Sequence, residues 1–408
     1  MRKTNVVTNK ILLLIGITII SISCVNLPKI ELPTAVPTFD SSTLISQISV
    51  QDSSGWNWNE IPAPTLEPRP QNSPQLIIGL DGRLHLFWDT LGGAEAFIYH
   101  SYFQDGLWSE PAPISLTLGT SKLYETPVIS PGGVIHILWF NELKLGGSYR
   151  LLYAQFDGVN WSEEDEVYTS KKDLNLRGEL FVDSQSTIHS VMKAATGINS
   201  DLFYLTKTSG GWDVSEPITP KMGMDGLVVW KYKLMQTGQV LFYGKDLNRN
   251  LRFAYWENGT TSSVTKTKIQ LPIHTDFFVD STGNYYTYWA GQVPIPGGTT
   301  MGAYYQCIDT DLHSWSETVL SGEKTVITKP LVAQTQSASV IAWINRDDTI
   351  EFLFPNGCES ANVYSLNLPE STTQKQLISL AMSEEPSKLC AMNKQNYNEF
   401  KLYCAEIQ

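Results

Sequence analysis

The chain has 408 residues, of which 42% are hydrophobic and only 17% are charged, and its formal net charge is −12. This composition provides ample material for a core and leaves much of the surface to uncharged polar residues, which is typical of a secreted β protein. The acidic balance repels phosphate backbones and therefore argues against nucleic acid as a partner.

The N-terminus has the pattern of an export signal. Arg2, Lys3 and Lys10 precede an apolar run over residues 11–22 that is too short for a comfortable membrane span. The segment from Ser21 to Cys24 resembles the lipobox of bacterial lipoproteins, although the family usually has an aliphatic residue where this chain has Ser21.

The lipobox resemblance implies a signal peptide over residues 1–23, cleavage before Cys24 and a lipid anchor on its sulfur. An ordinary signal peptide and an uncleaved anchor are the alternatives, and all three interpretations place the rest of the chain outside the cytoplasm. Because residues 1–23 hold three cations and no acid, cleavage changes the formal charge from −12 to −15. Residues 24–46 are rich in proline in their first half and predict a tether that connects the anchored Cys24 to a domain over residues 47–408.

A repeat begins near Pro74, and residues 127–164 are its best-preserved copy. Four short runs rich in β-branched and aromatic residues alternate there with Pro-Gly-Gly, Gly-Gly and Asp-Gly turns, which predicts a four-stranded antiparallel meander. The second run of each copy carries a large side chain at an equivalent place, at intervals of 46 to 54 residues: Trp88, Trp139, Met192, Tyr243, Trp289, Trp343 and Met392. Seven copies of this length predict an all-β, seven-bladed β-propeller.

The turn into the fourth strand is a second landmark. It is followed by Trp and Ser in Trp108-Ser109 and Trp161-Ser162, and it is eroded in the fourth copy, where Asn258-Gly259 lacks the Trp. The last copy has three strands, and residues 55–62 resemble the missing fourth one. The sequence therefore predicts that an N-terminal strand completes the last blade and closes the ring.

Besides Cys24 the chain has Cys307, Cys358, Cys390 and Cys404, an even number for an oxidising compartment. Cys390 and Cys404 flank a hairpin centred on Tyr397, which predicts a disulfide between paired strands. Cys307 and Cys358 either pair across neighbouring repeats or stay free and buried. No spacing of Cys and His indicates a metal site, and no motif indicates a cofactor.

The pattern Leu/Ile-His-x-x-Trp, Leu-x-Tyr, Asp-Gly, Trp-Ser-Glu-Pro resembles the sialidase-like propellers over about residues 50–408, with a degenerate Asp-box (BNR-type) repeat. The Asp-box is structural in that family, so the resemblance supports the fold and not an activity. Active sialidases have six blades, three arginines that converge on the substrate carboxylate, a Tyr nucleophile and an Asp acid/base. This chain has seven copies, lacks the family's Arg-Ile-Pro segment and offers Arg69 only in a different spacing.

The residues that lead into the first strand of each copy are candidates for a site at the mouth of the central channel. The expected ligand-binding residues are Tyr124, Glu125, Arg177, Asp225, His274 and Asp276, with Glu179 beside Arg177. Acids with nearby Arg or His suit a sugar ligand or glycoside hydrolysis, whereas polar residues ring any solvent-filled channel. The connection over residues 290–300 is expected to be a long loop on the same face.

His85, His136 and His189 recur in the second strands, and we interpret them as packing residues between blades that bond to neighbouring backbone. Two functional hypotheses remain. In the first, the protein binds glycans or another extracellular ligand, including a protein, without catalysis. In the second, it is a glycoside hydrolase of the sialidase-like type with its acids at the channel mouth.

Overall fold

A computed structural model describes the part of the chain that follows the predicted signal and tether. Its contacts group Leu44–Gln408 into one compact unit, and the predicted features at residues 1–46, Cys24 included, lie outside the described residues. The described residues are 56, 58–64, 66–90, 95–143, 147–171, 177–196, 199–219, 231–234, 238–245, 250–262, 265–270, 276–279, 284–295, 298–308, 318–319, 330–335, 338–345, 349–356, 360–367, 376–383, 387–394 and 399–406.

The regular structure of these residues consists of antiparallel strands that pair into separate sheets, numbered here in chain order. Sheet 1 contains β2 (Gln75–Ile78), β3 (Leu84–Asp89), β4 (Ile98–Gln104), β5 (Leu107–Trp108) and β6 (Ala112–Pro113). Sheet 2 contains β7 (Thr120–Lys122), β8 (Val128–Ile129), β9 (Ile135–Leu143), β10 (Ser148–Phe156) and β11 (Asp165–Ser170). Sheet 3 contains β12 (Arg177–Val182), β13 (Ile188–Thr196), β14 (Asn199–Thr208) and β15 (Gly211–Val214).

The remaining sheets follow the same order of strands. Sheet 4 contains β16 (Lys231–Leu234), β17 (Val240–Lys245), β18 (Asn250–Glu257), β19 (Thr260–Thr261) and β20 (Thr265–Gln270). Sheet 5 contains β21 (Asp276–Val279), β22 (Tyr285–Ile295), β23 (Gly298–Ile308) and β24 (Thr318–Val319). Sheet 6 contains β25 (Leu331–Gln334), β26 (Ser339–Ile344), β27 (Thr349–Asn356) and β28 (Ser360–Asn367). Sheet 7 contains β29 (Gln376–Ser383), β30 (Lys388–Lys394), β31 (Phe400–Glu406) and β1 (Asn59–Ile61).

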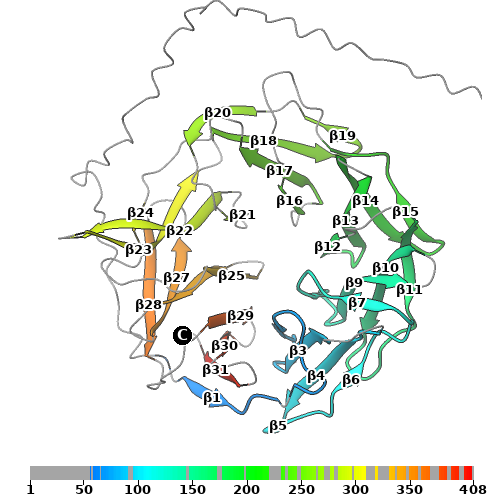
Figure 1. Cartoon of the computed structure of the whole chain (residues 1–408), viewed down its shortest axis with the longest axis horizontal. Coiled ribbons are helices and arrows are strands. Elements are labelled where there is room, and N and C mark those ends of the chain that lie inside the picture. Colours follow the sequence, from blue (N-terminus) through cyan, green and yellow to red (C-terminus); the bar gives the residue numbers. More distant parts are fainter. Residues whose placement is uncertain are drawn as a thin grey trace, which may run out of the picture. The chain divides into compact units, whose positions relative to one another are not determined.

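Figure 1 shows the strands of the sheets one after another along the chain. Hydrophobic clusters of buried residues lie between neighbouring sheets. Separate clusters join sheets 1 and 2, 2 and 3, 3 and 4, 5 and 6, and 6 and 7, and a further cluster joins sheet 7 to sheet 1. Five of the recurrent side chains of the second strands take part in these clusters: Trp88, Trp139, Met192, Trp343 and Met392. Trp88, Trp139 and Trp343 are at most 1% exposed. A single four-stranded sheet buries neither face alone, so packing against two neighbours supplies the core. The buried Trp side chains are therefore core residues rather than surfaces for a ligand.

Two of the predicted turns have the backbone conformation that their residues favour. Asp105 and Gly106 have φ of 51° and 84°, and Asn258 and Gly259 have φ of 48° and 81°. Positive φ at both central residues matches the twist of a two-residue hairpin, and Asn, Asp and Gly tolerate it best. The Asn258-Gly259 turn therefore persists where the following Trp is missing.

The serine after the fourth-strand turn has a repeated structural role. The hydroxyls of Ser109, Ser162, Ser215 and Ser262 accept hydrogen bonds of 2.9–3.1 Å from backbone N–H groups of the preceding strand, on Tyr102, Gln155, Tyr204 and Tyr255 respectively. Each serine N–H also donates to the carbonyl of the same partner residue. The serine therefore satisfies backbone groups of the preceding strand, with or without a Trp before it, and belongs to the scaffold.

The N-terminal strand β1 pairs with β31, with Asn59 opposite Cys404 and Ile61 opposite Leu402. The residues just before it pack on sheet 6, where the rings of Trp58 and Phe352 stack with centroids 5.1 Å apart. Segments from the two ends of the described chain thus share one sheet.

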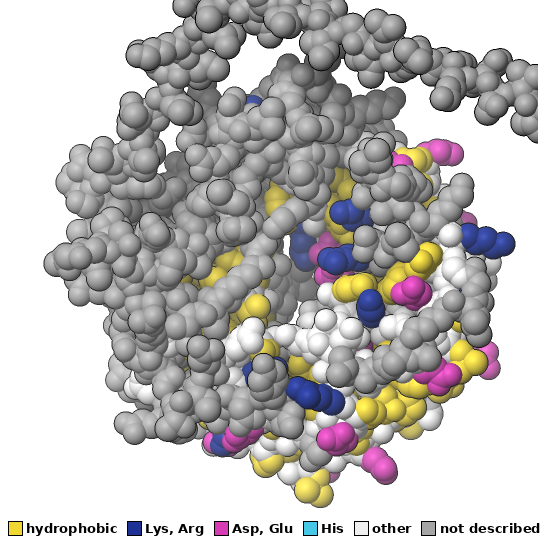
Figure 2. All heavy atoms as spheres, viewed as in Figure 1, with side chains coloured by type: hydrophobic (Ala, Val, Ile, Leu, Met, Phe, Trp, Pro, Cys, Tyr) yellow, Lys and Arg dark blue, Asp and Glu magenta, His cyan; other side chains and the backbone are white. Residues whose placement is uncertain are grey.

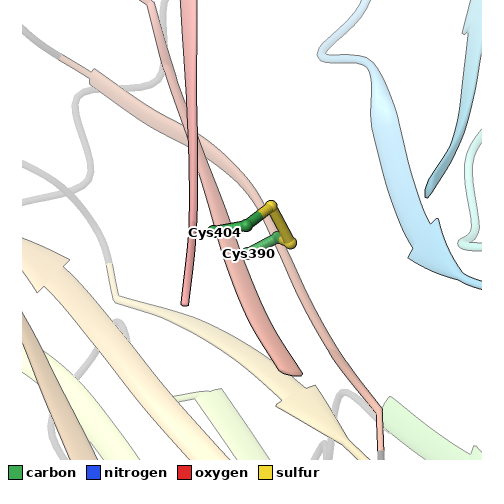
Figure 3. Close-up of a disulfide and its surroundings, with 2 residues drawn as sticks. All are labelled: Cys390 and Cys404. Atoms are coloured by element: carbon green, nitrogen blue, oxygen red, sulfur yellow. A yellow bond between two sulfur atoms is a disulfide. The ribbon is translucent and has the colours of Figure 1, made fainter. Parts of the chain in front are cut away.

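Cys390 on β30 and Cys404 on β31 are joined by a disulfide (Figure 3). The two residues lie directly opposite each other in the register of these strands. Cys307 is 1% exposed and is also disulfide-bonded, and Cys358 lies outside the described residues.

Two local expectations are wrong. Residues 290–295 and 298–300 belong to β22 and β23, which pair from Tyr285–Ile308 to Ile295–Gly298, so the expected loop is a long hairpin. Its β-branched residues Val293, Ile295, Thr299 and Thr300 favour paired strands over a loop.

The repeated histidines bond to side chains rather than to backbone. His85 contacts His100 at 3.0 Å, His136 contacts the Tyr153 hydroxyl at 2.6 Å, and His189 contacts Asp183 at 3.3 Å. The strand backbone around them is already occupied by the pairing of the sheet, so an imidazole finds its partner on a facing side chain.

Candidate functional site

The first strand of sheet 2 is interrupted by residues 123–127. β7 pairs with β9 up to Lys122 opposite Phe140, and β8 resumes the pairing with Val128 opposite His136. The chain takes six steps from Lys122 to Val128 against four on β9, so two extra residues leave the ladder. Such a bulge re-aims side chains, and it is the segment that carries Tyr124 and Glu125.

Arg177 meets this segment from the neighbouring sheet. It begins β12, and its guanidinium carbon lies 4.6 Å from the centre of the Tyr124 ring. A guanidinium over an aromatic face is attracted by the ring quadrupole and retains its outward N–H donors. The pair therefore joins sheets 2 and 3 and offers a cation beside an aromatic ring.

A second link joins sheets 3 and 4. Lys233 Nζ lies 2.9 Å from Glu179 Oε1, and the backbone N–H of Leu234 donates to Glu179 Oε2 at 3.0 Å. Glu179 is the third residue of β12 and Lys233 the third of β16, so both belong to first strands. Both oxygens of Glu179 thus have donors, which holds its carboxylate in one orientation.

Glu125 lies in the field of these charges. Burial and, after it, the Glu179 carboxylate raise the pKa of Glu125 to about 7, although the charges of Lys233 and Arg177 act in the opposite direction. The side chain therefore exchanges a proton near neutral pH, and it can donate or accept a hydrogen bond there.

Two further groups feel the same charges. The Glu179 carboxylate raises the pKa of Lys233, so this lysine stays charged. Burial, followed by the charges of Glu179 and Glu125, holds the pKa of Tyr232 well above its usual value, so its hydroxyl keeps its proton. We call Tyr124, Glu125, Arg177, Glu179, Tyr232 and Lys233 the mouth cluster.

Figure 2 shows Lys and Arg side chains beside acidic ones around the hollow that lies over β12 and β16 in Figure 1. The mouth cluster brings cations, carboxylates and phenol rings together from three adjacent sheets. Among the described residues no group of His, Cys, Asp and Glu has the arrangement of a metal site. No helix in the described part of the chain has the length and apolarity needed to cross a membrane.

The structure brings four of the predicted residues together, namely Tyr124, Glu125, Arg177 and the neighbouring Glu179. Asp225 and His274 lie outside the described residues, and Asp276 begins β21 with a side chain that also lies outside them. The prediction missed Tyr232 and Lys233. The sequence feature that could have indicated them is the presence of Lys231 and Lys233 at alternate positions of a short first strand, where aliphatic residues are usual.

No family model and no curated protein sequence matches the chain. Among solved structures, the polysaccharide lyase Uly1 superposes with a TM-score of 0.51 at 9% identity, over 84% of this chain and 90% of that one. The SapL1 lectin in complex with α-methyl fucoside has a TM-score of 0.39 at 11% identity, over 74% and 99%. An α-L-arabinofuranosidase from Fusarium graminearum has a TM-score of 0.41 at 14% identity, over 86% and 97%. The likeness to Uly1 is a likeness of the fold alone.

Proposed function

We propose that this chain is a glycan-binding protein on a seven-bladed β-propeller whose ring is closed by β1. Two findings support the ring: the strands of the described residues pair into seven sheets, and a hydrophobic cluster joins the last sheet to the first. The pairing of β1 with β31 supplies the fourth strand of sheet 7. In this ring the first strands line a central channel, and the mouth cluster lies at their N-terminal ends.

The proposal extends to the location of the protein. Residues 1–23 act as a lipoprotein-type signal, Cys24 carries the lipid and residues 24–46 tether the propeller to the outer side of a bacterial membrane, at the cell surface or in the periplasm. The support is the sequence Ile22-Ser23-Cys24 after a charged and then apolar stretch. Incorporation of a labelled fatty acid into the wild type, and its loss in Cys24→Ala, tests this location. Labelling that persists in the variant contradicts it.

The mouth cluster carries the binding proposal. A saccharide needs fixed donors and acceptors for its hydroxyls and an aromatic face for its apolar side. Arg177 against Tyr124 and Lys233 against Glu179 provide both. Arg177, Glu179 and Lys233 belong to first strands, and Tyr124 lies in the interruption between β7 and β8. The likeness to Uly1 extends only to the fold, so the residues of the cluster carry the argument.

A glycan array probed with the Cys24→Ser protein tests the binding proposal. We expect a defined set of glycans to bind, and Arg177→Gln to lower the affinity at least tenfold. Glu166→Gln is the matched control, because Glu166 lies exposed on β11 away from the cluster. Absence of any glycan ligand, or equal binding by Arg177→Gln, contradicts the proposal.

One observation favours glycoside hydrolysis as a second candidate function. Glu125, whose pKa is about 7, lies near the carboxylate of Glu179, and hydrolysis needs a protonated and an ionised carboxyl group across the scissile bond. In this candidate Glu125 is the acid, and activity falls as the pH rises above about 7. Turnover of fluorogenic glycosides that is lost in Glu125→Gln and kept in Glu166→Gln would establish the enzyme.

A further inference from the structure

Arg177 in the mouth cluster carries a charge that no described residue pairs. It is exposed at the start of β12, and its guanidinium carbon lies 4.6 Å from the centre of the Tyr124 ring. Among the described residues, no acidic side chain forms a salt bridge with Arg177 and no group accepts a hydrogen bond from its guanidinium. Contact with an aromatic face leaves the N–H edge of a guanidinium open. Arg177 is therefore held in place with its donors available.

The acid on the same strand as Arg177 is already occupied. Glu179 lies two residues further along β12, so the two side chains point to the same face of sheet 3. One oxygen of Glu179 accepts from Lys233 Nζ at 2.9 Å, and the other accepts from the Leu234 N–H at 3.0 Å. Because both oxygens have donors, Glu179 compensates the charge of Lys233 and leaves that of Arg177.

Glu125 is the member of the mouth cluster whose charge can change. It is partly exposed, and its carboxyl group forms neither a salt bridge nor a hydrogen bond with any described residue. The charged and titratable groups that act on it come from two strands, Arg177 and Glu179 from β12 and Tyr232 and Lys233 from β16. Tyr232 keeps its proton and Lys233 its charge. Glu125 therefore decides the charge of the cluster near neutral pH.

The charge of the cluster depends on this one proton. With Glu125 protonated, two cations face one carboxylate, and one positive charge is in excess. With Glu125 ionised, two cations face two carboxylates, and no charge is in excess. An anionic ligand group is attracted in the first state, whereas in the second it meets a carboxylate that competes for Arg177. The protonated carboxyl group also offers an O–H donor that the ionised group lacks.

We propose that the mouth cluster binds an acidic glycan while Glu125 is protonated, so that binding takes up a proton and weakens as the pH rises. This linkage rests on the proposed glycan-binding function and adds the class of glycan and its regulation. Arg177 binds the anionic group, a carboxylate or a sulfate, through its N–H edge. Protonated Glu125 donates its O–H to the same ligand, and Tyr124 keeps the guanidinium in its orientation. The proton comes from solvent and returns to it when the ligand leaves.

The pH range of the effect follows from the pKa of Glu125, which is about 7. The ligand binds the protonated form more tightly, so the pKa of Glu125 rises in the complex. Below pH 7 the free protein already holds the proton, and the affinity is level and at its maximum. Above pH 7 the proton must be taken up on binding, and the Kd rises by up to about tenfold for each further pH unit.

Calorimetric titration of the Cys24→Ser protein at pH 6 and pH 8 tests this linkage, with a galacturonic acid trisaccharide, a sulfated disaccharide and a neutral galactose trisaccharide as ligands. We expect the Kd of the acidic ligand to be about tenfold higher at pH 8, and any binding of the neutral ligand to be independent of pH. Buffers of different ionisation enthalpy should reveal uptake of most of one proton per ligand at pH 8. Preference for the uronate or for the sulfate identifies the anionic group.

Three variants and one measurement on the unsubstituted site locate the proton. Glu125→Gln keeps a donor and cannot ionise, so at pH 8 it should bind the acidic ligand as tightly as the wild type does at pH 6, without proton uptake. Arg177→Gln should weaken binding at least tenfold at both pH values. Glu166→Gln, which removes an exposed acid on β11, should keep the wild-type pH dependence. In carboxyl-carbon NMR at pH 8, Glu125 should be ionised in the free protein and protonated in the complex.

The outcomes separate the linkage from the wider function. If glycans bind and weaken in Arg177→Gln without any pH dependence, or if the pH dependence persists in Glu125→Gln, the linkage is wrong and glycan binding stands. A Glu125 carboxyl group that stays ionised in the complex at pH 8 overturns the linkage in the same way. If no saccharide binds at either pH, both proposals are overturned. Equal melting temperatures of all variants exclude misfolding as the cause.

Discussion

The buried carboxylate of Asp89 accepts a hydrogen bond of 3.2 Å from the backbone N–H of Leu123, the first residue of the interruption in sheet 2. The same carboxylate accepts hydrogen bonds from the backbone and side-chain N–H groups of Asn72, so one side chain fixes the segments that lead into the first strands of sheets 1 and 2. A buried acceptor with three donors is costly to remove, since each donor is then left without a partner.

Asp89→Asn should therefore destabilise the protein by about 1–3 kcal/mol. The substitution replaces one acceptor oxygen by an NH2 group, which would face the N–H donors of Asn72 and Leu123 and could not accept from them. Urea unfolding followed by tryptophan fluorescence measures this. Asp81→Asn is the control, since Asp81 is an exposed carboxylate whose pairing with Arg83 is local. Equal unfolding midpoints for both variants would show that Asp89 does not hold these segments.

The buried imidazole of His85 predicts a loss of stability in mild acid. Burial lowers the pKa of His85 from 6.5 to about 4, so the unfolded chain binds a proton that the folded chain excludes. Stability is then complete above pH 6.5 and falls as the pH drops toward 4, by up to about 3 kcal/mol from this group. His85→Phe should flatten that part of the profile, measured by denaturant unfolding at several pH values. Tyr102→Phe is the control: it changes a ring next to His85 and leaves the imidazole in place, so the pH profile should keep its wild-type shape.

The charges of the mouth cluster predict how Glu125 titrates. Because the Glu179 carboxylate raises the pKa of Glu125 and Lys233 lowers it, Glu179→Gln should lower that pKa and Lys233→Met should raise it. Carboxyl-carbon NMR of Glu125 across pH 4–9 measures both shifts. Shifts of the same sign in the two variants would exclude the arrangement described for the cluster.

The N-terminal strand predicts a large effect from a short deletion. Removal of residues 50–64 takes away β1 and the Trp58 ring that stacks on Phe352, so we expect loss of cooperative unfolding rather than a slightly smaller domain. Trp58→Ala alone should cost roughly 2–4 kcal/mol. Leu107→Ala, at a side chain that is 75% exposed, should cost little. A deletion mutant with the parental melting temperature would contradict closure by β1.

The repeated features could be predicted from the sequence because each copy of the repeat supports the interpretation of the others. The Trp series, the Asp-Gly and Asn-Gly turns and the opposition of Cys390 and Cys404 all follow from spacing and period. Only part of the mouth cluster could be predicted from the sequence. Tyr124, Glu125 and Arg177 stand next to strand starts, but the interruption between β7 and β8 has no separate sequence signal.

Contacts between sheets were the hardest to predict. Asp89 directly follows Trp88 in an apolar strand, where a lone acid is unusual, but its partners Asn72 and Leu123 are set by how neighbouring sheets pack. The contact of Lys233 with Glu179 depends in the same way on the spacing of β12 and β16. Pattern within a strand indicates which face is buried, whereas distances across sheets come from the assembled structure.

The pairing of β1 with β31 also bears on the order in which the protein can assemble. Glu60 and Lys401 form a salt bridge across 341 residues of sequence, and closing a loop of that length costs about 5 kcal/mol of chain entropy. During synthesis the N-terminus leaves the ribosome first, so β1 emerges first and β31 emerges last. Sheet 7 is therefore complete only when almost the whole sequence has emerged, and its packing against sheets 1 and 6 is among the last contacts to form during biosynthesis.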